Sequence, residues 1–328
     1  MMIVEATAPG KAILFGEHSV VYRGPAIVLA IDKRARVLTR ERDDDRLFFD
    51  AMDLGFSGYF EGDAYQPVTG EAWRGKRLEA FKECARKTLG HIGVEKGLDM
   101  TVRSELPIAA GLGSSAALCV ATVASVGALF EADLPLEDIS TLAYEGEKVV
   151  HGTPSGVDNN ISTYGGILRY EKDIGFERFE LEYEIPFIIG NTRRKRSTKR
   201  LVDRVRRLRD REPELVEGII DSIVSISESG LEALKESDLP RLGDLMNVNH
   251  GLLSALGVSI SKLDMMVHAS RGAGAYGAKL TGAGGGGCMM AFASEPKLED
   301  VYRAIHRCRG DPHLVKVSYE GVKTRRLE

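Results

Sequence analysis

The sequence predicts an α+β protein with two domains, and three observations lead to this fold class. The chain has 328 residues, which is enough for two domains with separate buried cores. Strand and helix patterns alternate, but without the regular repeat of parallel βαβ units. An acidic stretch without clear periodicity, 171–184, separates two well-patterned halves. We therefore place the domains at residues 1–175 and 176–328.

Composition limits the partners and the location that we expect. Hydrophobic residues make up 43% and charged residues 28% of the chain, as in a globular protein, and the net charge is −4. No overall positive field attracts nucleic acid or acidic membranes. The four cysteines form no C-x-x-C pair and the chain starts without a signal-peptide pattern, so we expect reduced thiols in a cytoplasm.

Hydrophobic periodicity predicts the elements in order. Apolar residues alternate or cluster over 2–31 with breaks at Pro9-Gly10 and 23–25, so we expect short strands joined by turns. The alternation in Leu98–Ser104 predicts a half-buried strand. Helical patterns cover 71–89, begin again near Ser114, and reappear after Asp133. The apolar run 116–130 is too short to cross a bilayer and predicts a buried helix. Further strands are expected at 167–170, 185–190, 287–293 and 314–319, with long helices between 201 and 256.

One carboxylate lies on the apolar side of a predicted helix. In the helix after Asp133, residues Ile139, Leu142, Ala143 and Val150 form an apolar stripe. Glu147 follows four residues after Ala143 and therefore projects from that apolar side. A carboxylate placed there needs a partner.

The stretch 107–118 is a small-residue loop that runs into a helix. Gly111 and Gly113 let the backbone approach an anion closely, and unpaired backbone N–H groups with the positive end of the helix dipole point at the same place. A hydroxyl at the first turn, from Ser114 or Ser115, can bind a magnesium ion that bridges phosphates. The loop is therefore a candidate phosphate site that contains no lysine.

Two other interpretations of this loop stay open. Its spacing matches the dinucleotide fingerprint G-x-G-x-x-A, in which the first glycine closely follows a strand and an acid ends the next strand. Here 105–110 intervenes and Asp133 precedes a helix, which disfavours that interpretation. A structural turn that binds no ligand is the second alternative.

Polar residues gather in an apolar segment near the start of the chain. Lys11, Glu17 and His18 lie between glycines and apolar residues over 8–21, where a lone buried charge is costly. If each residue is considered alone, Lys11 is expected to extend its ammonium group to the solvent. His18 is then expected to be a core histidine whose ring nitrogens are hydrogen-bonded. Their joint presence favours a functional site.

Asp158 is the single acid in the small, neutral stretch 151–160. An aspartate among Gly, Pro, Ser and Asn is usually a turn former. The alternative is a base, or an orienting group, that faces a substrate hydroxyl.

The stretch Lys279–Gly287 ends in four successive glycines and leads into a strand. Such a run loses much backbone entropy on folding, so a plain linker is a poor explanation. Close approach to the phosphate of a ligand explains it better.

With these stretches assembled, the sequence resembles the GHMP kinase family of small-molecule kinases, named for galactokinase, homoserine kinase, mevalonate kinase and phosphomevalonate kinase. Three motifs of the family appear in order over nearly the whole chain. They are Ala8-Pro-Gly-Lys11, Pro107-x-x-x-Gly-Leu-Gly-Ser-Ser-Ala-Ala117 and Lys279-x-Thr-Gly-Ala-Gly-Gly-Gly-Gly-Cys288. Within the family the chain is most similar to the mevalonate kinase subgroup, through the segments 15–21, 147–159 and 191–199.

The resemblance implies a fold and an activity. The fold has an N-terminal domain with a left-handed βαβ unit and a C-terminal ferredoxin-like domain, with the active site between them. The activity is transfer of the ATP γ-phosphoryl group to the 5-hydroxyl of mevalonate, which gives 5-phosphomevalonate and ADP on the route to isoprenoids. It also implies ATP as co-substrate, Mg²⁺ as metal ion and a homodimer, with neither a nucleic acid nor a membrane as partner.

The resemblance also assigns roles to residues of this sequence. Asp158 accepts or orients the proton of the substrate hydroxyl, and Lys11 stabilises both that carboxylate and the charge that develops on the transferred group. Ser115 and Glu147 bind Mg²⁺. The nucleotide phosphates are held by Ser104, Gly111, Leu112, Gly113, Ser114 and Ser115. Mevalonate is contacted by Glu17, His18, Thr198, Gly284 and Arg196.

Alternatives to this function remain. Another small-alcohol kinase of the family, such as phosphomevalonate kinase, shares the same loops, and a non-catalytic ligand sensor with this fold is a different class. Two departures from the family stand out, namely Ala109-Ala110 where a glycine is usual and the cation-rich loop Arg193–Arg196. With the cations of 199–211 that loop resembles a nucleic-acid patch, but no aromatic residues interleave it, so we interpret it as a solvated helix face that attracts anionic substrates.

Overall fold

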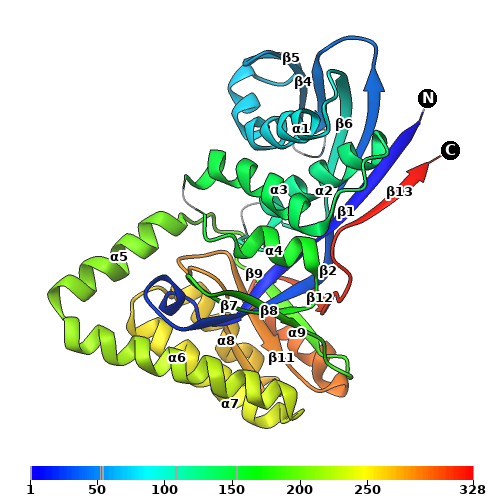
Figure 1. The fold of residues 1–328 in the computed structure, drawn as a ribbon. Helices are drawn as coiled ribbons and strands as arrows, with labels where there is room; N and C mark the ends of the chain where they lie inside the picture. Colours follow the sequence, from blue (N-terminus) through cyan, green and yellow to red (C-terminus); the bar gives the residue numbers. More distant parts are fainter. Residues whose placement is uncertain (1, 52, 54, 108–109, 153, 328) are drawn as a thin grey trace.

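Two β-sheets with helices packed on them make up the fold, which confirms the α+β class (Figure 1). The computed structural model describes residues 2–51, 53, 55–107, 110–152 and 154–327. The larger sheet has the strand order β13-β1-β2-β6-β3-β4-β5, with β7 paired to β2 and β8 to β7. Its strands are β1 (Ile3–Phe15), β2 (Pro25–Arg42), β3 (Leu47–Ala51), β4 (Phe56–Glu61), β5 (Ala64–Thr69), β6 (Gly97–Ser104), β7 (Ile167–Glu171), β8 (Gly175–Phe179) and β13 (Lys323–Leu327).

The first two strands are long, whereas the sequence predicted short strands joined by turns. The pair Pro9-Gly10 does not end β1, because the strand continues to Phe15 and the register with β2 shifts at that point, as in a β-bulge. A bulge absorbs the irregularity and leaves the chain paired on both sides. Lys11 directly follows the bulge. The predicted half-buried strand is confirmed as β6, which buries Leu98, Met100 and Val102.

Helices α1 (Glu79–Ile92), α2 (Ser114–Leu129), α3 (Leu136–His151) and α4 (Val157–Tyr164) belong to the same half as the large sheet. The buried helix predicted over 116–130 is confirmed as α2. The helix predicted over 71–89 starts late, because Ala72–Arg77 forms a 3-10 turn ahead of α1. Val150 was expected in the apolar stripe of α3, but it is 52% exposed near the end of that helix.

The acidic stretch 171–184 is irregular only in part, because residues 180–184 have no regular structure but strand β8 lies within it. Strands β7 and β8 form a hairpin there, with Ile167 opposite Phe179. At the other end of the chain, β13 returns to the large sheet and pairs with β1, so that the two termini lie side by side (Figure 1). A division of the chain into domains at residue 175 stays a prediction.

The smaller sheet is antiparallel and has the order β10-β11-β9-β12. Its strands are β9 (Pro186–Asn191), β10 (Gly277–Leu280), β11 (Cys288–Phe292) and β12 (Asp311–Lys316). The helices of this half are α5 (Thr198–Arg211), α6 (Pro213–Lys235), α7 (Leu239–Ala255), α8 (Ser261–Gly272) and α9 (Leu298–Arg307). One hydrophobic core holds buried residues of both sheets, which joins the two halves firmly. Among the described helices, none is both long and apolar enough for a membrane span.

Candidate active site

An ion pair between Lys11 and Asp158 lies at the centre of the candidate site. The Lys11 Nζ and the Asp158 Oδ1 are 3.1 Å apart, although the residues come from β1 and α4. The lysine side chain is 8% exposed and the aspartate side chain 36% exposed, so the carboxylate faces the solvent while the cation lies beneath it. Asp158 is in the first turn of α4, where the helix dipole favours an anion. The structure thus brings together the two residues that the sequence proposed as catalytic.

The candidate phosphate loop, which ends at Gly113 and which we call the phosphate loop, contacts Lys11 directly. The backbone N–H of Lys11 donates to the carbonyl oxygen of Leu112 at 2.9 Å. Gly113 has φ 75°, which favours glycine, and a Cβ atom at this residue would lie 2.8 Å from the Lys11 Cγ. Gly113 also precedes the first residue of α2, so the amino end of that helix opens beside the lysine. The cation that the loop lacks in sequence is therefore supplied by β1.

Two serines at the start of α2 connect the loop to its surroundings. The Oγ atoms of Ser104 and Ser114 are 3.1 Å apart, which ties the end of β6 to the helix. The Ser115 hydroxyl donates to the Glu147 Oε1 at 2.7 Å. Glu147 is only 3% exposed, on the face of α3 that packs towards α2. The partner that this carboxylate required is thus the serine proposed as a metal ligand.

Arg196 behaves differently from the cations that precede it. Residues 193–195 are exposed. The Arg196 guanidinium, in contrast, is enclosed by the phosphate loop and by residues 282–287, which we call the glycine run. A Cβ atom at Gly111 would lie 1.6 Å from its Nη2, and one at Gly287 would lie 3.0 Å from its Nε. Burial lowers the pKa of Arg196, and its buried Nη1 has no hydrogen-bond partner among the described residues. An anionic group is the natural partner for this guanidinium.

Glu17 and His18 are both buried, but they face different groups. Glu17 is 2% exposed, and its two carboxylate oxygens contact the Lys279 Nζ and the Asn249 Nδ2. His18 has φ 65°, and its Nε2 lies 3.0 Å from the Ala283 carbonyl oxygen, so this nitrogen must donate. Burial lowers the pKa of His18, which favours the neutral ring.

Sequence reasoning gave no role to Lys279 or Asn249. A signal for Lys279 did exist, because a lysine within the apolar strand Gly277–Leu280 has to find a counterion. Asn249 gave no comparable signal, since an asparagine in a helical pattern is ordinarily a surface residue.

Two predicted contact residues lie at less direct positions. Gly284 has φ 78°, and a Cβ atom there would lie 2.1 Å from the Val258 carbonyl oxygen, so its packing against the loop after α7 already requires glycine. Thr198 is exposed as the first residue of α5, and the described contacts include no hydrogen bond from it to Asp158. The departure at Ala109-Ala110 falls partly outside the description, because Ile108 and Ala109 lie outside the described residues.

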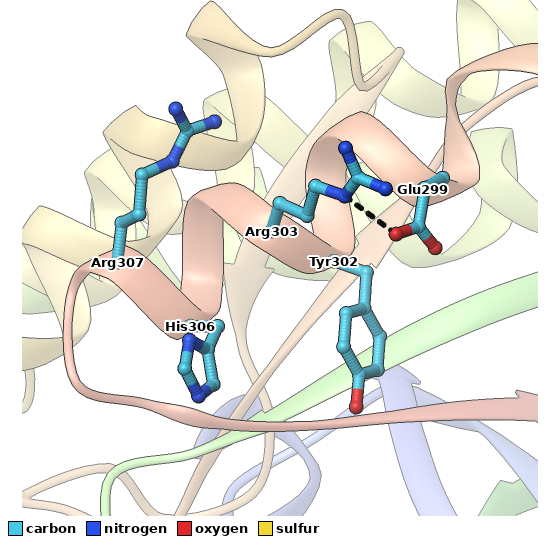
Figure 2. Close-up of a pocket in the computed structure, with 5 residues that line it drawn as sticks. All are labelled: Glu299, Tyr302, Arg303, His306 and Arg307. Carbon is cyan, nitrogen blue, oxygen red and sulfur yellow. Dashed lines mark hydrogen bonds and ion pairs between the residues drawn. The ribbon is translucent and has the colours of Figure 1, made fainter.

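A surface hollow on α9 contains none of the residues of this site. Figure 2 shows its lining, which comes entirely from one side of α9 and includes Tyr302, His306 and Arg307. Its volume is about 400 Å³, and it contains none of the predicted site residues. We therefore define the candidate active site by the convergence of β1, α2, α4 and the glycine run.

Similar proteins identify the family. Residues 78–166 match the family model of the N-terminal domain of GHMP kinases, and residues 231–311 match the model of their C-terminal domain. The mevalonate kinase of Thermococcus sibiricus is 41% identical over 330 residues, with 98% of both chains covered.

Solved structures give the same answer. The Methanococcus jannaschii mevalonate kinase has a TM-score of 0.81 at 30% identity and covers 97% of this chain and 98% of its own. The L. major mevalonate kinase, solved in complex with R-mevalonate, has a TM-score of 0.80 at 28% identity, with 96% of each chain covered. The predicted family and two-domain fold are confirmed: the chain belongs to the GHMP kinase family and, within it, to the mevalonate kinases.

Proposed function

We propose that this chain transfers the γ-phosphoryl group of ATP to the 5-hydroxyl of mevalonate, giving 5-phosphomevalonate and ADP. The observation that carries the proposal is the Lys11–Asp158 ion pair, held beneath the phosphate loop at the amino end of α2. The choice of substrate is supported by the relatives, which are mevalonate kinases and are similar to this chain over nearly their whole length.

In this proposal Asp158 and Lys11 act on the two sides of the reacting hydroxyl. The half-exposed carboxylate of Asp158 accepts the hydrogen bond of the hydroxyl and orients its oxygen for attack. Lys11 pairs with that carboxylate and faces the negative charge that develops on the transferred group. Because a phosphoryl transition state is loose, positioning and charge neutralisation contribute more than the strength of the base.

Ser115 and Glu147 fit a magnesium ion. They bring a hydroxyl oxygen and a carboxylate oxygen to 2.7 Å of each other, and Mg²⁺ prefers oxygen ligands. Magnesium in kinases is usually held by one or two protein groups together with the phosphates of the substrate. An ion held there by Ser115 and Glu147 would neutralise phosphate charge.

Glu147→Gln tests the metal role. We expect the Mg²⁺ concentration for half-maximal rate to rise about 10- to 100-fold, because an amide oxygen attracts the ion less than a carboxylate. The measurement is ADP release during a magnesium titration. The matched control is Glu145→Gln on the same helix, where the glutamate forms an exposed pair with Lys148 and should change little. Equal magnesium requirements in both variants would refute this assignment.

Arg196 and α5 complete the proposal on the substrate side. The unpartnered Nη1 of Arg196 is suited to the carboxylate of mevalonate, through a charge-assisted hydrogen bond. The exposed cations of α5 act at longer range and attract anionic substrates. A homodimer is part of the proposal through the family alone.

The decisive experiment is coupled ADP release against mevalonate, phosphomevalonate, homoserine and galactose. We expect turnover with mevalonate and little with the other three compounds. Preference for phosphomevalonate would select the neighbouring kinase. Binding of mevalonate without any ADP release would indicate the non-catalytic sensor.

A further inference from the structure

A buried ion pair joins the two halves of the molecule beside the candidate site. The Lys279 Nζ contacts the Glu17 Oε1 across 262 residues of sequence, and their side chains are 0% and 1% exposed. The Nζ also donates to the Leu280 carbonyl oxygen at 2.9 Å, and the Asn249 Nδ2 donates to the Glu17 Oε2 at 3.3 Å. Three elements, namely the turn after β1, β10 and α7, therefore meet at one carboxylate.

Such a pair is a poor source of stability. Burial raises the pKa of Glu17 and lowers the pKa of Lys279, and each partner opposes the shift of the other. The attraction between two fully buried charges is largely offset by the loss of their hydration, so well-packed apolar residues serve stability as well or better. The role of the pair should therefore be sought in what it holds in place.

The pair holds the turn that carries His18 against the glycine run. His18 follows Glu17 directly and has φ 65° and ψ −41°, which lies outside the small left-handed region that histidine tolerates, so the surrounding contacts must hold it there. Its ring donates to the Ala283 carbonyl oxygen at 3.0 Å. Thr281, two residues after Lys279, accepts from the Ile13 backbone N–H at 3.0 Å and donates to the Ile13 carbonyl oxygen at 2.8 Å. The three links fix β1 and the glycine run in one arrangement.

Both oxygens of Glu17 are engaged, so little of this carboxylate is left for a ligand. We propose that Lys279 and Asn249 are positioning residues, which act through Glu17 to set His18 and the glycine run for mevalonate, and that Glu17 itself does not touch the substrate. This inference rests on the proposed function for its substrate. It differs from the family-based expectation that Glu17 contacts mevalonate.

The test uses two variants with opposite pH dependence. Lys279→Met leaves the buried carboxylate of Glu17 without its counterion. Burial raises the pKa of Glu17, so the neutral form is favoured at low pH. Its kcat/KM for mevalonate should therefore fall as pH rises, by about 10- to 100-fold relative to the wild type. Glu17→Gln strands a buried lysine, whose lowered pKa favours the neutral form at high pH, so its kcat/KM should fall as pH decreases.

Other charged groups near the pair are shared by both variants. They are Arg196 near Glu17, and His250 near Lys279 with Asp264 and Arg271 beside it. Their titration cannot produce slopes of opposite sign. The double variant Lys279→Met with Glu17→Gln has no buried charge without a counterion. Its kcat/KM for mevalonate should therefore depend on pH as that of the wild type does. The surface control Lys316→Met, which removes an exposed pair with Glu184, should follow the wild type.

Steady-state constants and hydrogen exchange separate positioning from general damage. We expect KM for mevalonate to rise while KM for ATP changes about twofold at most, since the phosphate loop is held by other contacts. Faster amide exchange should be confined to 16–22 and 281–287, with α9 unchanged. Parallel pH profiles in the two single variants, or exchange raised throughout the molecule, would overturn the proposal. Because exchange needs no turnover, the positioning role stays testable even if mevalonate is not the substrate.

Discussion

Asp158→Asn is expected to lower kcat with mevalonate by about 100- to 10,000-fold while ATP still binds. The amide keeps the shape of the side chain but loses the charge that pairs with Lys11 and that accepts the hydroxyl hydrogen bond. The phosphate loop lies between β6 and α2 and is held by the Ser104–Ser114 and Lys11–Leu112 contacts. These contacts do not involve the Asp158 carboxylate. The checks are a single-turnover measurement of 5-phosphomevalonate and calorimetric titration with ATP.

The outcome separates three roles of Asp158. Loss of turnover with intact ATP binding supports the catalytic role, whereas loss of ATP binding would place the carboxylate at the nucleotide. Turnover within a few-fold of the wild type would show that Asp158 is a turn former. Asp173→Asn is the matched control, because Asp173 lies in the β7–β8 turn with φ 67°, a conformation that asparagine also adopts readily.

Lys11→Met is expected to reduce kcat by about 100- to 1,000-fold, as the loss of a preorganised charge at the transferred group does elsewhere. The lysine is buried and methionine has a similar length, so the fold should persist and the melting temperature should stay near that of the wild type. No buried charge is stranded, because Asp158 reaches solvent. The measurement is kcat at saturating ATP and mevalonate, beside circular dichroism.

A double variant tests whether Lys11 and Asp158 act as a unit. If they do, Lys11→Met combined with Asp158→Asn should be little slower than the slower single variant. Fully multiplicative losses would mean that the two residues act independently, against the ion pair as a functional unit. The exposed Lys172→Met, in the β7–β8 turn, controls for removal of a positive charge.

The chain's own pattern determined the parts of the site that local chemistry dictates. Glycines and serines ahead of a helix indicated the phosphate loop, and Glu147 on an apolar face indicated a partner, which is Ser115. Alternation of apolar and polar residues predicted β6, and a long, mostly apolar run predicted α2. For the phosphate loop, β6 and α2, the residues that decide the structure lie within a few positions of one another, so their spacing carries the information. The partner of Glu147, in contrast, lies 32 positions away and was identified by the packing of α2 on α3.

Other features were settled only when distant segments packed together. Spacing cannot show that Pro9-Gly10 is a bulge within a long strand, because the partner strand β2 decides whether the chain stays paired. The strand β7 depends in the same way on its pairing with β2, and β8 then pairs with β7 in a stretch whose pattern is weak. Tertiary context thus overrode the local signal at both places.

Lys11, Asp158 and Glu17 could be identified as candidate charged residues of the site from the motifs that contain them. Which charges pair with each other depends on how distant segments pack. Lys11 faces Asp158 because β1 packs against both α2 and α4, whereas Glu17 faces Lys279 because the Lys279 side chain reaches from β10 to the turn after β1. The physical reason is that a buried charge takes whichever counterion the packed interior brings within reach, and sequence distance does not limit that choice.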